Sequence, residues 1–200
     1  MKKNIKFVYF DAGNVLFDYA PGWNEVVSLK KLPKDSLSDV YLNHSIDLNC
    51  GQMEFNDVFD IVLRKHKVKV DPDFNALWEI TKSYKPINET HALVNEIKNN
   101  YQLGILSNAV NKMIDFSITH GMIPNIEWDE VVDSSKIGLI KPNRKIYEYA
   151  TEKSGANNNE ILFIDDLKEN VDAAEKCGWN IVHFDFLNPK KSVEEIKKII

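Results

Sequence analysis

Short apolar segments that alternate with helical patterns constrain the fold of this 200-residue chain more than any other feature. Apolar or β-branched segments typical of strands occupy residues 5–11, 101–107, 130–133, 160–166 and 179–184. Helical spacing of apolar residues lies between them, at 89–99, at 111–120, from Pro142 onward and at 167–176, and Ser192 is expected to cap a final helix. Strands that are apolar on both faces and are joined by helices predict an α/β fold, a parallel sheet with helices on both faces.

Polar side chains follow three of the predicted strands at the point where each strand ends. These residues are Asp11, the pair Ser107-Asn108 and the pair Asp165-Asp166. Parallel sheets of this kind bind ligands beyond the carboxyl ends of their strands. The sequence therefore predicts that these side chains converge on one site.

Residues 17–84 interrupt the alternation, because they show helical patterns and no convincing strand. The patterns lie at 23–30, 37–46, 55–66 and 74–84. We expect a core domain made of residues 1–16 and 85–200, and an all-helical cap domain made of residues 17–84. An insertion directly after the first strand is expected to lie over the carboxyl edge of the sheet as a lid.

Composition and charge exclude several classes of function. The chain has 25 Lys and Arg against 30 Asp and Glu, a net charge of −5, which argues against a nucleic-acid partner. The chain contains no run of 18 apolar residues, so no membrane span is expected, and the first residues do not resemble an export signal. Cys50 and Cys177, each at an expected helix end, are interpreted as reduced thiols in a cytoplasmic protein, either a monomer or a weak dimer.

Each polar residue also has an ordinary structural interpretation. Asp11 alone could cap a turn, and Ser107-Asn108 could cap a helix instead of binding an anion. Lys141, at an expected helix start, opposes the helix dipole, so it either meets an anion or Asp11 or is solvated. Capping explains one member of the Asp165-Asp166 pair but not both, and two buried carboxylates favour a hard divalent cation such as Mg²⁺.

Together these motifs resemble the haloacid dehalogenase-like (HAD) superfamily of hydrolases, in the branch with a helical cap and a DxGN first motif. The matching segments, in order, are DAGNV at 11–15, ILSNA around Ser107, KPNRKIY from Lys141 and FIDDLKENVDAA around Asp165-Asp166. The resemblance implies a Rossmann-like core and a Mg²⁺-dependent phosphatase. It covers essentially the whole chain, and the four motifs in this order are far more specific than any one of them.

The resemblance also implies a role for each matched residue. Asp11 would be the nucleophile that forms an aspartyl-phosphate, and Lys141 would neutralise charge between it and the phosphate. Ser107 and Asn108 would hold the phosphoryl group. Asp11 and Asp166 would bind Mg²⁺, with the Gly13 carbonyl oxygen and Asp165 in support, and Asn170 would buttress the last loop.

Gly13 departs from the superfamily pattern, because most phosphatases of the superfamily carry a general acid–base Asp at this position. Such a group typically contributes about 10²–10⁴-fold to the rate. The proton would then come from a cap residue, for which Asp18, His44 and Asp47 are candidates, or from a metal-ordered water or the substrate. Trp23, near the start of the cap, is interpreted as a core residue or a substrate contact.

Three functions remain open at this point. The first is hydrolysis of a small phosphorylated metabolite, for which a sugar phosphate such as a hexose 1-phosphate is the preferred example. The second is carbon–halogen hydrolysis of a 2-haloacid, which uses the same first Asp without a metal. The third is a phosphate-binding module that has lost turnover through Gly13.

Overall fold

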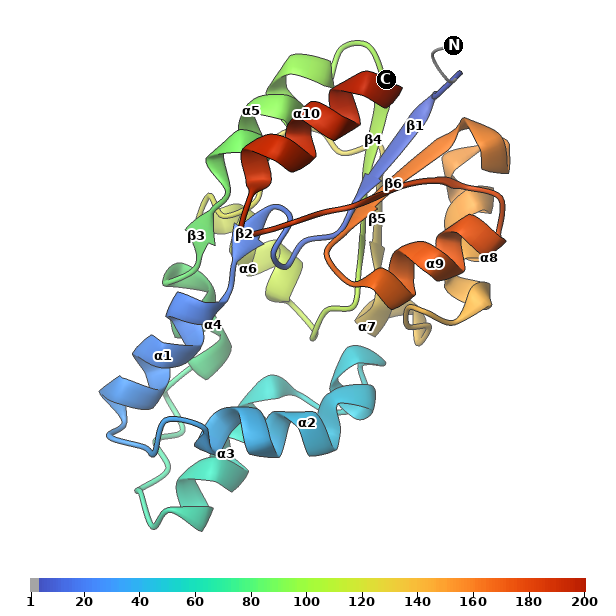
Figure 1. Ribbon diagram of the computed structural model, residues 1–200. Helices are drawn as coiled ribbons and strands as arrows, with labels where there is room; N and C mark the ends of the chain where they lie inside the picture. The colour runs from blue at the N-terminus through green and yellow to red at the C-terminus, as the bar shows by residue number, and fades with distance from the viewer. Residues whose placement is uncertain (1–3) are drawn as a thin grey trace.

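A five-stranded parallel sheet forms the centre of the protein, which a computed structural model describes over residues 4–200 (Figure 1). Residues 1–3, part of the predicted segment 1–16, lie outside the described residues. The strand order is β5-β4-β1-β6-β7. The bounds are β1 Phe7–Phe10, β4 Gln102–Ser107, β5 Glu130–Asp133, β6 Ile161–Asp165 and β7 Asn180–His183.

Helices cover both faces of this sheet, because alternate residues of each strand point to opposite sides. Val8 and Phe10 of β1 belong to the hydrophobic cluster that includes α5 and α10, whereas Phe7 and Tyr9 face the cluster that includes α8 and α9. The helix bounds are α5 Asn88–Ile97, α6 Met113–Thr119, α8 Arg144–Ser154, α9 Lys168–Lys176 and α10 Pro189–Ile199. The predicted α/β fold class, a Rossmann-like sheet with helices on both faces, is confirmed.

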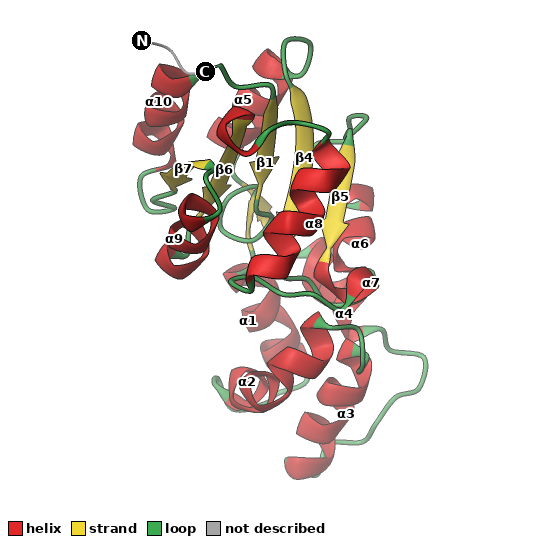
Figure 2. Ribbon diagram, turned by 90° about the vertical axis from the view of Figure 1, so that its right-hand side faces the viewer, coloured by secondary structure: helices red, strands yellow, loops and turns green. Residues whose placement is uncertain are grey.

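The four helices α1 to α4, which follow β2 and precede β3 in the chain, lie together beyond the carboxyl ends of the strands, as the direction of the arrowheads in Figure 2 shows. They are α1 Ala20–Leu29, α2 Ser36–Asn49, α3 Phe55–Lys65 and α4 Ala76–Lys82. A two-stranded antiparallel ribbon joins this group to the rest of the chain. It pairs β2 Phe17–Asp18 with β3 Lys85–Pro86, so the chain leaves and returns at adjacent points.

Several predicted element boundaries are wrong. Helix α8 begins at Arg144, where the Asn143 side chain caps it, so Pro142 precedes the helix. Ser192 lies inside α10, and its hydroxyl accepts a hydrogen bond from the Asp185 backbone N–H instead of capping the helix. Ser107-Asn108 does not open a helix, because α6 begins only at Met113.

Four short elements are absent from the sequence prediction. They are the strands β2 and β3, the four-residue helix α7, Ser134–Ile137, and the 3₁₀ turn η1, Asn158–Glu160. Because β2 lies within residues 17–84, the expectation that this segment contains only helices is wrong at its first two residues. Cys50 and Cys177 lie at the C-terminal ends of α2 and α9, as predicted. Within residues 4–200, no helix combines the length and the apolar character that crossing a membrane requires.

Close packing of α1 on α4 requires a glycine at position 22. A Cβ atom on Gly22 would overlap the backbone oxygen of Ile80 and approach the ring of Tyr84. We therefore predict that Gly22→Ala lowers the free energy of unfolding by about 1–3 kcal/mol, the usual result of overpacking. Helix propensity alone predicts the opposite sign, a gain of about 1 kcal/mol.

Urea unfolding of Gly22→Ala measures this difference. Ser28→Ala is the matched control, because Ser28 lies on the exposed side of the same helix. The control should change the unfolding free energy by less than about 0.5 kcal/mol. A Gly22→Ala variant as stable as the wild type would contradict the proposed packing.

Candidate active site

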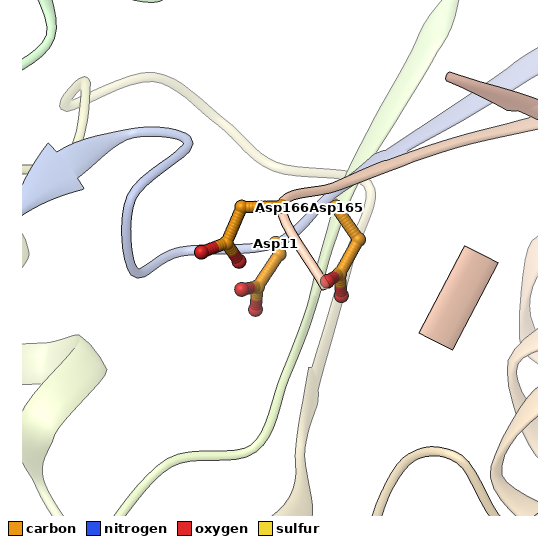
Figure 3. A group of neighbouring side chains, drawn as sticks. All are labelled: Asp11, Asp165 and Asp166. Carbon is orange, nitrogen blue, oxygen red and sulfur yellow. The ribbon is translucent and has the colours of Figure 1, made fainter. Parts of the chain in front are cut away.

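Three carboxylates meet at the carboxyl end of the sheet (Figure 3). Asp11 directly follows β1, Asp165 is the last residue of β6, and Asp166 comes next. Because β1 and β6 are parallel, hydrogen-bonded neighbours in the sheet, their carboxyl ends lie side by side. One oxygen atom from each carboxylate lies within 4.8 Å of the others. In Figure 3 the carboxylate of Asp11 lies between those of Asp166 and Asp165.

The ammonium group of Lys141 is buried against two of these carboxylates, with the residue only 3% exposed. Its Nζ donates to Asp11 Oδ1 at 2.8 Å, to Asp165 Oδ2 at 2.6 Å and to the Leu106 carbonyl oxygen at 2.9 Å. Of the environments that the sequence left open for Lys141, contact with Asp11 is therefore the one observed, and solvation is excluded.

The backbone of Lys141 is held by a side chain that the sequence assigned to phosphate binding. Asn108 Oδ1 accepts from the Lys141 N–H at 2.8 Å, and Asn108 Nδ2 donates to the Lys141 carbonyl oxygen at 2.9 Å. These two hydrogen bonds fix the loop that precedes α8. The side chain of Asn108 thus positions Lys141, a function that spacing in the sequence does not reveal.

Asp165 is fully buried, and hydrogen bonds surround its carboxylate. Besides Lys141, it accepts from the Leu167 backbone N–H at 2.8 Å and from Asn170 Nδ2 at 3.1 Å and 3.0 Å. Asn170 lies in the first turn of α9, so it ties that helix to the end of β6. The structure thus shows Asn170 bound to Asp165, and the role of Asp165 in support of a metal ion stays a prediction.

Asn14 is a site residue to which the sequence analysis gave no role. Its side chain donates from Nδ2 to Asp166 Oδ2 at 2.9 Å. Its backbone has a φ of 56°, in the left-handed region that Asn tolerates better than most residues. The only signal in the sequence is the turn-forming pair Gly13-Asn14 directly after a buried strand.

Burial shifts the ionisation of the cluster. Burial raises the pKa of Asp11 above its ordinary value, against the opposing effects of the Lys141 ammonium and the Ser107 hydroxyl. Burial likewise raises the pKa of Asp166, which the hydrogen bond from Asn14 opposes. Burial lowers the pKa of Lys141, but the charges of Asp11 and Asp165 outweigh it, so that the net shift is upward.

The cluster as a whole fits a divalent cation. Three carboxylates and one ammonium group carry a net charge of −2 when ionised, in a largely buried place. Buried charges of one sign are costly unless an opposite charge compensates them. Carboxylate and carbonyl oxygens, with waters and phosphate, are the ligands that suit Mg²⁺.

A cavity of about 390 Å³ opens above Asp11 and collects most of the predicted site residues. Gly13, Ser107, Asn108, Lys141 and Asp166 line it together with Asp11, and Asn170 does so as well. Asp165 alone among the predicted site residues does not line it, because it lies buried behind Lys141.

The predicted proton donors are not among the residues that line this cavity. Asp18, His44 and Asp47 all lie outside the lining, and Asp18 accepts instead from the Ala20 N–H at 2.9 Å. Trp23 lines the cavity and also packs against the hydrophobic core, so its interpretation as a substrate contact stays a prediction. Tyr19, which sequence reasoning missed, covers the space beside Gly13.

Comparison with known proteins gives a family and a set of structural relatives. Residues 5–178 match the haloacid dehalogenase-like hydrolase family. Glyceraldehyde 3-phosphate phosphatase from Methanothermobacter thermautotrophicus is 22% identical, with 89% of this chain and 84% of that protein covered. For three other curated relatives, the match spans only 13–41% of their length.

Two solved structures show the same fold. A HAD family enzyme from Bacteroides thetaiotaomicron, crystallised with magnesium and inorganic phosphate, has a TM-score of 0.72 at 17% identity, covering 90% of this chain and 94% of that one. L-2-haloacid dehalogenase from Xanthobacter autotrophicus, with chloropropionic acid covalently bound, has a TM-score of 0.70 at 18% identity, covering 90% and 77%.

The family match extends over most of the chain and includes all four segments that meet around Lys141 and the three carboxylates. The chain therefore belongs to the haloacid dehalogenase-like hydrolase family.

Proposed function

We propose that this hydrolase is a Mg²⁺-dependent phosphatase of small phosphomonoesters that works through an aspartyl-phosphate on Asp11. The observation that carries the proposal is the Asp11 carboxylate, held at 2.8 Å by Lys141 and facing a cavity beside Asp166. Phosphoryl transfer needs positioning and charge neutralisation more than further covalent chemistry. The relative named as a glyceraldehyde 3-phosphate phosphatase supports this choice.

Each residue has a defined part in this proposal. Asp11 attacks the phosphorus, and Lys141 orients its carboxylate. The Ser107 hydroxyl and the Asn108 backbone bind the phosphoryl oxygens. Asp11 and Asp166 would hold Mg²⁺, with the Gly13 carbonyl oxygen and Asp165 in support. When bound, the ion supplies positive charge that offsets the phosphoryl oxygens and the carboxylates.

We further propose that residues 17–84 act as a helical cap, in the branch of the family with the DxGN first motif. The ribbon of β2 and β3 supports this, because it is the narrow connection through which α1 to α4 attach to the sheet. Residues of α1, α2, α3 and α4 line the cavity above Asp11. The cap would therefore contact the leaving group while the core, residues 1–16 and 85–200, carries the chemistry.

Carbon–halogen hydrolysis is the second candidate, favoured by the likeness to L-2-haloacid dehalogenase and by the absence of a side chain at Gly13. A 2-haloacid carries a carboxylate, which needs a cationic partner. Among the described residues that line the cavity, Lys141 is the only cation, and Asp11 and Asp165 already neutralise it. Halide release from a 2-haloacid without added Mg²⁺ would reverse this ranking.

Replacing the nucleophile tests the chemistry. We predict that Asp11→Asn lowers kcat for phosphate release at least about 10³-fold, because an amide cannot replace the attacking carboxylate. Release of inorganic phosphate from acetyl phosphate measures it. Asp172→Asn, which removes an exposed carboxylate from a surface ion pair with Lys168, is the matched control and should keep full activity. Retained hydrolysis in Asp11→Asn would reject the assignment.

Replacing Asp166 tests the metal site. Asp166→Ala removes one of the two carboxylates assigned to the ion, so the Mg²⁺ concentration for half-maximal activity should rise at least about tenfold. A Mg²⁺ titration of phosphate release compares the variant with the wild type, and Asp172→Ala again serves as the control. Superimposable titrations for Asp166→Ala and wild type would place the ion elsewhere.

A further inference from the structure

The cavity above Asp11 has an aromatic wall. Rings from the β2–α1 segment, from α2 and α3 and from the residues after α4 line it: Phe17, Tyr19, Trp23, Tyr41, Phe55 and Tyr84. Phe17 and Tyr84 are stacked with ring centroids 4.7 Å apart. Trp23 is nearly perpendicular to Tyr41 and to Phe55, with ring centroids 4.9 Å and 6.0 Å apart. Because these rings support one another, the wall offers flat, preformed surfaces.

Charged groups in this cavity are confined to its floor. Among the described lining residues, the charged side chains are Asp11, Lys141 and Asp166. Lys141 is already bonded to two carboxylates, so it is not free to bind a second anionic group on the substrate. If the leaving group carried a carboxylate or further phosphates, its charge would lie against the aromatic wall without an oppositely charged partner. The hydroxyl groups that residues 17–84 contribute to the lining are those of Ser38, Tyr19, Tyr41 and Tyr84, so a hydroxyl-rich leaving group would meet these hydroxyls and otherwise ring and aliphatic surface.

The wall also lacks a group suited to protonating a leaving oxygen. Gly13 has no side chain, and a Cβ atom there would lie 3.3 Å from Tyr19 Cδ1, so the Tyr19 ring fills that side. The only ionisable groups on the wall, among the described residues, are phenols, whose ordinary pKa is about 10. Burial raises the pKa of Tyr41 and of Tyr84 further, so both hold their protons firmly.

We propose, on the basis of the phosphatase function above, that the substrates are aryl phosphomonoesters whose uncharged ring packs against the aromatic wall. A phenol has a pKa of about 10, as tyrosine does, and an aliphatic alcohol is a much weaker acid. A phenolate therefore leaves without a proton donor, whereas an alkoxide needs one. This substrate class differs from the hexose phosphate suggested by the family resemblance.

The reaction balances without a further reagent. An oxygen of Asp11 bonds to phosphorus as the bond from phosphorus to the aryl oxygen breaks. The electron pair leaves with the phenolate. Water then attacks the phosphorus and the bond to Asp11 breaks. One proton of this water stays on the released phosphate as its hydroxyl, and the other passes through solvent to the phenolate.

The proposal is tested with the wild-type protein, Mg²⁺ and four substrates. These substrates differ in whether they carry an aromatic ring and in how acidic the leaving group is. Phenyl phosphate has the ring and the phenolic leaving group, and benzyl phosphate has the ring with an aliphatic one. Glucose 1-phosphate lacks an aromatic ring, and acetyl phosphate lacks one too but has a leaving group that needs no proton donor. We expect kcat for phenyl phosphate to exceed that for benzyl phosphate at least about 100-fold, the lower range of general-acid assistance. Glucose 1-phosphate should have the lowest kcat/KM.

The outcomes separate the two proposals. If acetyl phosphate is hydrolysed, and benzyl phosphate or glucose 1-phosphate is hydrolysed with the same kcat and kcat/KM as phenyl phosphate, the aryl assignment is overturned and the phosphatase function stands. Hydrolysis of none of the four would overturn both.

Variants of the wall test where the ring binds. Trp23→Leu keeps an apolar side chain but removes the ring, so KM for phenyl phosphate should rise about tenfold while KM for acetyl phosphate stays within about twofold. Trp78→Leu is the matched control, because Trp78 packs on Phe116 and His120 and is not among the lining residues. An equal rise for both substrates, or for both variants, would contradict a ring site at Trp23.

The absence of charge on the wall has its own test at an exposed position. Leu42 lines the cavity and is 69% exposed, so a lysine there should fold normally. In the wild type, 4-carboxyphenyl phosphate should have a KM at least about tenfold above that of phenyl phosphate. Leu42→Lys should reduce this ratio severalfold. A wild-type ratio near one would overturn the claim that the wall rejects anionic rings.

Discussion

The buried ammonium group of Lys141 joins three parts of the chain that are far apart in sequence. It binds Asp11 after β1, the Leu106 carbonyl oxygen in β4 and Asp165 at the end of β6. Removing one partner from a buried ion pair typically costs about 3–5 kcal/mol, because the other charge is left uncompensated. The loop before α8 therefore cannot move away from the sheet edge without exposing or stranding charge. The position of Asp11, and with it the whole cavity floor, depends on this contact.

The floor of the site could be predicted because parallel strands impose it. Strands as apolar as those before Asp11 and Asp165 must lie inside a sheet, and their carboxyl ends must share one edge. The position of Ser107 could be predicted for the same reason. The position of Lys141 was harder to predict, because a lysine near a helix start can also point into solvent. Only its contacts with Asp11 and Asp165 show that it is buried in the site.

The remaining contacts depend on geometry that no local pattern encodes. Asn108 binds the backbone of Lys141, 33 residues away, and Asn14 binds Asp166, 152 residues away. The aromatic wall forms only when β2, α1, α2, α3 and the end of α4 come together. In the sequence, Tyr41 and Tyr84 are ordinary residues of predicted helices, and Tyr19 lies before the first of them. Ser192 was misassigned because its hydroxyl bonds to the Asp185 backbone from within the helix.

The floor and the wall of the cavity have different parts in the reaction that we propose. In the proposed reaction, charged groups from the sheet edge hold and attack the phosphoryl group, and uncharged rings from residues 17–84 contact the leaving group. Tyr19 lies between the floor and the wall, because its ring is beside Gly13, two residues after Asp11. The most direct measurement of this account is peptide mass spectrometry after acid quenching of the protein during turnover of acetyl phosphate with Mg²⁺. The account predicts one acid-stable, base-labile phosphoryl group on the peptide that contains Asp11. Turnover with the phosphoryl group on another residue, or with none on the protein, would contradict it.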